Sequence, residues 1–150
     1  MNFWTEENGL RKQLNYFLNK KVNAQGTIER YGTKTNFKGG DTITILLRDI
    51  TLTDENEKNI TIDHAWMKVG KTFARTNPTV NSLVSLNCHV KEYIKGYVNR
   101  REYIDERSVD VGVQRASQIK ILKRGDGESF KEFYKQRKNT RFFAKIYNDL

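Results

Sequence analysis

Apolar and polar side chains alternate over residues 84–97, and this alternation constrains the fold more than any other feature of the sequence. Successive side chains of an extended strand point to opposite faces, so the pattern predicts a strand with one buried face and one exposed face. The buried face would carry Val84, Leu86, Cys88, Val90, Ile94 and Val98. The exposed face would carry Lys91, Tyr93, Lys95 and Tyr97.

The exposed face alternates cations with rings, which has two interpretations. Ammonium groups pair with phosphates and aromatic rings stack on bases, so the face suits a strand of nucleic acid. Tyr also favours strands and Lys keeps sheet edges soluble, so the same residues are common on an ordinary solvent face. The formal net charge of +9 favours an anionic partner, with nucleic acid first and an acidic protein or membrane surface second.

Four further segments have the alternation or the β-branched content of strands, which makes the chain mainly β. They cover residues 22–31, 42–50, 60–63 and 117–122, and residues 109–113 alternate again before the last of these segments. Between them, residues 32–41 predict a flexible loop, and residues 64–77 predict a short helix or compact loop. Trp66 and Phe73 in that segment are expected to plug the open end of a barrel rather than to form a stacking platform.

Helical patterns flank the strands. Leucine and phenylalanine recur at helical spacing over residues 5–19, which predicts an amphipathic helix. Its apolar stripe would dock on the domain or, alternatively, on a partner. Residues 125–150 predict a basic helix or tail after a glycine-containing turn. A chain of 150 residues is most simply a single domain with such appendages.

Three strands, a short helix, a strand, a long loop and a final strand follow one another from residue 22 to residue 123. In this order the chain resembles the OB-fold single-stranded nucleic-acid-binding proteins, and it is similar to the small basic proteins that phages and mobile elements encode. The resemblance implies a mainly β chain with flanking helices (α+β). The chain would divide into an N-terminal helix over residues 1–21, a five-stranded OB-like barrel over residues 22–124, and a basic C-terminal helix or tail over residues 125–150.

In the OB family the ligand lies across strands 2 and 3, between the loop that joins strands 1 and 2 and the loop that joins strands 4 and 5. The resemblance places nucleic-acid-binding residues at Lys34, Phe37 and Lys38 in the first loop, at Arg48 on the face, and at Arg100, Arg101, Tyr103 and Arg107 in the second loop. No aromatic residue occurs between Thr42 and Asp63, and residues 53–63 are rich in acidic side chains. A groove along strand 4, past Lys91, Tyr93, Lys95 and Tyr97, is therefore an alternative path.

The sequence predicts no enzyme and no cofactor. With His64 and His89 as the only histidines and Cys88 as the only cysteine, a closed Cys/His zinc site is excluded, although a two-histidine acid–base pair stays formally possible. The glycine turns at residues 39–41 and 125–127 lack the spacing of a phosphate loop. A divalent cation or, more simply, a solvated acidic turn would explain the carboxylates of Asp49, Asp54, Glu55, Glu57 and Asp63.

The compartment and the partner follow from the same features. A single cysteine suits a reducing compartment, and no apolar run approaches the length of a membrane span, so we expect a cytoplasmic protein away from the membrane. We expect non-catalytic binding of single-stranded nucleic acid, DNA more than RNA. The alternative is a protein-interaction module, such as a phage or mobile-element factor that docks on a replication or defence protein. That alternative requires an exposed apolar patch on residues 5–19 or 128–147.

Overall fold

The computed structural model describes residues 16–35, 39–95, 98–99, 104–105 and 108–147, and of residues 92–115 it describes the backbone alone. The elements in chain order are β1 (Lys21–Thr35), β2 (Asp41–Thr53), β3 (Asn59–Lys68), α2 (Lys71–Thr76), β4 (Leu83–Lys95), β5 (Val98–Asn99), β6 (Ile104–Asp105), β7 (Ser108–Lys123), α3 (Phe130–Arg137) and the 3-10 helix η1 (Lys145–Tyr147). The prediction of a mainly β chain is confirmed. The predicted N-terminal helix lies almost entirely outside the described residues.

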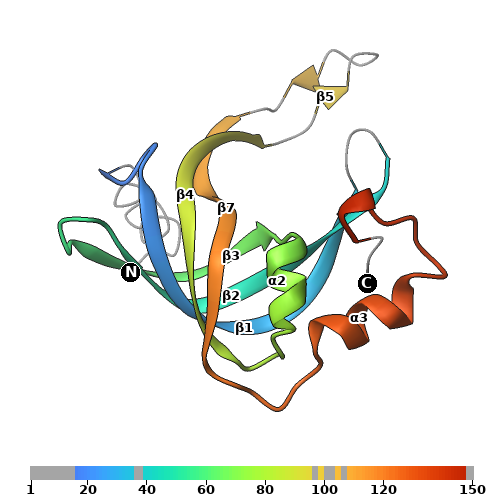
Figure 1. Ribbon diagram of the computed structural model, residues 1–150. Helices are drawn as coiled ribbons and strands as arrows, with labels where there is room; N and C mark the ends of the chain where they lie inside the picture. Colours follow the sequence, from blue (N-terminus) through green and yellow to red (C-terminus); the bar gives the residue numbers. More distant parts are fainter. Residues whose placement is uncertain (1–15, 36–38, 96–97, 100–103, 106–107, 148–150) are drawn as a thin grey trace.

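The main element is a five-stranded antiparallel sheet with the order β3-β2-β1-β4-β7 (Figure 1). The sheet curls so that Cα atoms of β3 approach those of β7 to within 8 Å. No hydrogen-bonded ladder joins these two strands in the described part of the chain. The sheet therefore ends in two edges, and the expected barrel is not closed.

The inner face of the sheet carries the core, as the alternation of residues 84–90 predicts, while the side chains of Ile94 and Val98 lie outside the described residues. Val84, Leu86, Cys88 and Val90 of β4 are all fully buried. Burial among apolar side chains raises the pKa of the Cys88 thiol to about 12, because the thiolate would lose its hydration there. Cys88 is therefore a small buried apolar residue, as the sequence indicates.

β2 and β3 are longer than predicted, because the alternation of each is interrupted, in β2 by a bulge at Asp49. Leu47 and Ile50 of β2 are both fully buried although they are three residues apart, and Asp49 between them has a left-handed φ of 52°. An extra residue of this kind shifts the side-chain alternation by one position. The residues opposite them, Ala65 and Ile62 of β3, are also three apart. The sequence pattern therefore appeared to end at residue 63, whereas β3 continues to Lys68.

Aromatic side chains of the C-terminal segment close one end of the core. α3 begins at the Ser129 cap, whose hydroxyl accepts the Glu132 N–H at 3.2 Å. The helix ends at Arg137, earlier than predicted, and the chain then returns to the start of β2. Tyr147 is fully buried there, and its ring lies 6.0 Å from that of Phe130. The C-terminal segment is therefore part of the folded unit.

β4 and β7 extend beyond the rest of the sheet as a two-stranded arm. The pairing of β1 with β4 ends at Lys21 and His89, whereas β4 pairs with β7 as far as Lys95 and Ser108. In Figure 1 this arm leaves the sheet and leads to the small β5–β6 pair. Part of the predicted long loop after strand 4 is therefore strand-paired.

Candidate functional site

The outer face of β1, β2 and β3 brings cations and one aromatic ring together. Residues directly opposite one another in an antiparallel sheet share a face. The pairing places Arg30, Leu46 and Trp66 in one row and Gly32, Thr44 and Lys68 in the next, with Lys34 beside Thr42 beyond them and Thr27, Arg48 and His64 in a row on the other side. We define the outer-face patch as Arg30, Lys34, Arg48, His64, Trp66 and Lys68.

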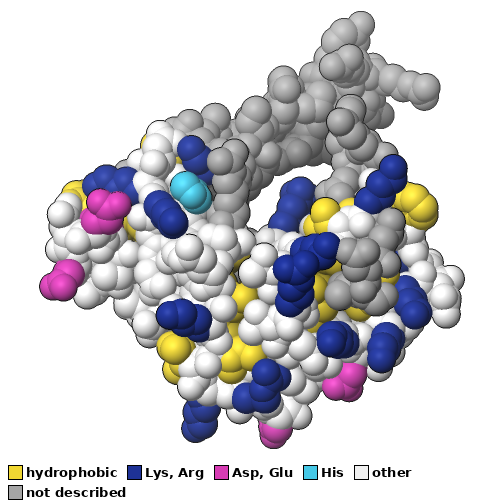
Figure 2. Space-filling model, viewed as in Figure 1, with side chains coloured by type: hydrophobic (Ala, Val, Ile, Leu, Met, Phe, Trp, Pro, Cys, Tyr) yellow, Lys and Arg dark blue, Asp and Glu magenta, His cyan; other side chains and the backbone are white. Residues whose placement is uncertain are grey.

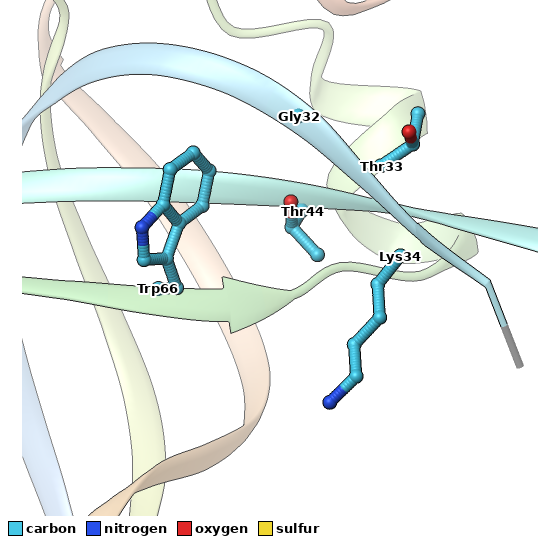
Figure 3. A pocket seen from close by; sticks show the side chains of 5 residues that line it. All are labelled: Gly32, Thr33, Lys34, Thr44 and Trp66. Atoms are coloured by element: carbon cyan, nitrogen blue, oxygen red, sulfur yellow. The ribbon is translucent and has the colours of Figure 1, made fainter. Parts of the chain in front are cut away.

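Trp66 is the central side chain of this patch, and Gly32 determines where its indole lies. A Cβ at residue 32 would lie 3.0 Å from the Trp66 ring and 3.0 Å from the Thr44 hydroxyl. The missing side chain therefore lets the indole reach from β3 across β2 toward β1 (Figure 3). The ring borders a shallow hollow of about 250 Å³, which is lined by Gly32, Thr33, Lys34, Thr44 and Trp66.

The indole is held in place and is still accessible. The Arg30 guanidinium lies 5.3 Å from the ring centroid, within the range of a cation–π contact. Leu46 forms the floor between them and is 5% exposed, whereas Trp66 is 44% exposed. Packing over a glycine and against an arginine stabilises a sheet by itself, but it leaves almost half of this ring free to contact another molecule.

The electrostatics of the patch favour an anion near Trp66. The rows nearest the ring combine exposed Arg30, Lys34 and Lys68 with uncharged partners. At the far end, the Asp49 carboxylate lies 3.9 Å from the Arg48 Nε, which partly neutralises that arginine. The positive potential of the patch is therefore greatest around the aromatic ring.

The structure brings together some of the predicted site residues and separates another. Lys34 lies in β1 rather than in a loop, and it shares the outer-face patch with Arg48, which is half-buried. Lys91 lies elsewhere, because its neighbour His89 pairs with the opposite end of β1, and its ammonium lies 3.4 Å from the Asn19 Oδ1. Tyr93 and Lys95 belong to the arm by their backbone, and their side chains, with Phe37, Lys38, Tyr97, Arg100, Arg101, Tyr103 and Arg107, lie outside the described residues.

Trp66 is the functional candidate that the sequence assigned to another role. Its predicted role as a plug is wrong, because its side chain lies on the outer face and is 44% exposed. Phe73 in α2 is 4% exposed and packs in the core. Alternation within residues 65–69 is a sequence signal for Trp66, since Ala65, Met67 and Val69 alternate with Trp66 and Lys68. The interrupted alternation between Ile62 and Ala65 disguised that signal.

Among the described residues, the histidines and carboxylates considered for acid–base catalysis or metal binding are not assembled into a site. His64 pairs with Arg48 on β2, whereas His89 pairs with Lys21 at the far end of β1, so the two histidines do not meet. Asp54 organises the turn after β2, since its Oδ1 accepts the Asn56 and Lys58 N–H groups at 2.9 Å. In the part of the chain that the structure describes, no three His, Cys, Asp or Glu side chains are grouped to hold a metal ion.

Comparison with known proteins gives no relative: no protein-family model, curated protein or solved structure matches this chain. Among the described residues, no helix has the length and apolar character needed to cross a membrane. The function of the patch must therefore be inferred from its own residues.

Proposed function

We propose that this chain binds single-stranded nucleic acid, DNA in preference to RNA, across the outer-face patch and without catalysing a reaction. The observation that carries the proposal is the half-exposed Trp66 ring among Arg30, Lys34 and Lys68. A base stacks on the ring while the cations neutralise the flanking phosphates. A duplex keeps its bases stacked inside, so a ring on a sheet surface favours unpaired strands.

The architecture supports the proposal. Three strands, α2, a further strand, a long excursion and a last strand follow the order of an OB-like barrel, a fold that is often partly open. In that fold the ligand crosses strands 2 and 3, and Arg48, Trp66 and Lys68 lie on β2 and β3 here. We propose that the curled sheet is an open OB-like barrel. The single cysteine, Cys88, is compatible with a cytoplasmic location.

Replacement of the ring tests this proposal. Trp66→Ala should weaken binding of a labelled single-stranded oligonucleotide by about 5- to 150-fold, because one stacked base contributes about 1–3 kcal/mol. Trp66→Phe should retain most of the affinity, because it keeps an aromatic face. Fluorescence anisotropy titrations measure both variants.

Leu122→Ala is the matched control, because Leu122 on β7 is exposed to a similar extent, 49% against 44% for Trp66. It should bind like the wild type. Equal affinities for Trp66→Ala and Leu122→Ala would refute the assignment of Trp66 to the interface.

One observation favours a second candidate, a protein-interaction module. Phe142 is 78% exposed and Ile146 is 48% exposed, within the C-terminal region where such a module would need an apolar patch. A replication or defence protein would be the partner of a phage or mobile-element factor of this kind. If this candidate is correct, the wild-type protein shows no preference for single strands. It instead binds a purified partner protein, and that binding requires both Phe142 and Ile146.

A further inference from the structure

Beyond the end of β3, residues 141–147 lie along the same edge of β2, and we call these residues the C-terminal strap. The Asp41 N–H donates to the Phe142 carbonyl at 2.7 Å, and the Ala144 N–H donates to the Asp41 carbonyl at 2.9 Å. β1 occupies the other edge of β2 at this point, where Thr35 pairs with Asp41. The strap therefore adds a short parallel bridge where β3 has ended.

The direction of the side chains along the strap follows from that bridge. Phe143 is paired with Asp41 and faces the core, where it is 8% exposed. Its neighbour Phe142 points to the opposite side, which is the face of Thr42 and Lys34. Phe142 thus extends the outer-face patch beyond Lys34. The parallel bridge places Phe142 level with Gly40, so along β2 it lies six residues from the row of Trp66, about 20 Å in an extended strand.

The strap holds this ring on a fixed backbone. The Arg141 guanidinium donates to the Asp41 carboxylate at 2.9 Å, and the Tyr147 hydroxyl bonds to the Ile43 N–H and the Val69 carbonyl. Phe142 is the most exposed large apolar side chain among the described residues, at 78%. Its ring is therefore accessible to another molecule.

The charges around the ring select the kind of contact. Between Phe133 and Tyr147 the chain has no acidic residue and five cationic ones, which are Lys135, Arg137, Lys138, Arg141 and Lys145. Figure 2 shows Lys and Arg side chains gathered over α3 and the C-terminal segment, with hydrophobic side chains exposed among them. A polyanion that also presents flat apolar faces complements this surface, and single-stranded nucleic acid has both properties.

We infer that Phe142 is a second stacking position, which extends the path of a bound single strand from Trp66 over the C-terminal strap. The inference rests on the proposed function of the outer-face patch. It assigns a binding role to residues outside strands 2 and 3, so the nucleic-acid footprint should be longer than the three-strand face alone provides.

Three variants of Phe142 test this inference with a labelled oligothymidylate of about 12 nucleotides, within the usual site sizes of such domains. Phe142→Ala and Phe142→Leu should each weaken binding by about 5- to 150-fold, because both remove the aromatic face. Phe142→Trp should bind at least as well as the wild type. Ile146→Ala, which removes an exposed apolar group without a ring, should leave the affinity unchanged.

The outcomes separate this inference from the proposed function. If the wild type binds and Trp66→Ala weakens binding, but both Phe142→Ala and Phe142→Leu bind normally, Phe142 is not a stacking position and only the inference fails. Weakening by Ala and not by Leu would mean an apolar docking surface, and would also overturn the inference. Absence of any single-strand binding by the wild type would overturn both proposals.

Discussion

The contact between Gly32 and Trp66 determines the geometry of the candidate site at the scale of single residues. An indole on β3 spans β2 only because β1 has no side chain at the position that it reaches. The same indole both stabilises the sheet by packing over Gly32 and stays exposed to solvent. The structural and functional roles of Trp66 can therefore be separated only by a change that moves the ring without removing it.

Gly32→Val is that change. The valine side chain would collide with the Trp66 ring and the Thr44 hydroxyl, so the indole should swing off β2 and single-strand affinity should fall about 5-fold or more. The chain has two tryptophans, so the emission of Trp66 is measured in a Trp4→Phe background, where a shifted maximum should report the displaced ring. Gly70→Ala is the control, since a Cβ there meets no atom within 4 Å. Normal affinity of Gly32→Val despite a shifted emission would argue against stacking.

The strap is the element that joins the C-terminal segment to the sheet. The Arg141 guanidinium and the Thr35 hydroxyl both donate hydrogen bonds to the Asp41 carboxylate, which lowers the pKa of Asp41. A carboxyl group whose pKa is lower in the folded state stabilises the fold above its unfolded pKa, about 3.9. That contribution is lost as the pH falls through the lower folded value.

Asp41→Asn should therefore reduce the free energy of unfolding at pH 7, by up to about 1 kcal/mol for a partly exposed ion pair. The difference from the wild type should shrink as the pH falls below about 4. Urea unfolding at pH 7 and pH 3 measures both effects, with Asp63→Asn on β3 as a control at an exposed carboxylate. A deficit that stays constant over this pH range would show that the ion pair does not stabilise the strap.

The strands and the strap show which structural features the sequence pattern predicts and which it does not. Unbroken alternation in residues 84–90 predicted both the strand and its buried face correctly, because every second side chain there meets a continuous core. The bulge at Asp49 on β2 and the interrupted alternation opposite it on β3 concealed Trp66, because one extra residue reverses the pattern. The strap was predicted as helix because its basic and aromatic residues suit both states. Only the long-range bond between Phe142 and Asp41 decides between them.

The whole molecule combines a curled, open sheet with a strongly positive charge. A net charge of +9 attracts any polyanion, so the charge alone is not informative about the ligand. The arrangement of the charge is informative, because cations surround exposed rings at Trp66 and, on our inference, at Phe142. Nonspecific attraction and binding at the outer-face patch therefore differ in their dependence on strandedness and on salt.

Fluorescence anisotropy with labelled single-stranded and double-stranded oligonucleotides over a salt series tests the central claim most directly. We predict tighter binding of single strands, with quenching of tryptophan emission. Four phosphate contacts, from Arg30, Lys34, Arg48 and Lys68, would give a slope of about −3 for log affinity against log salt. Equal, weak binding to single strands, duplexes and other polyanions, without quenching, would contradict nucleic-acid recognition by the outer-face patch.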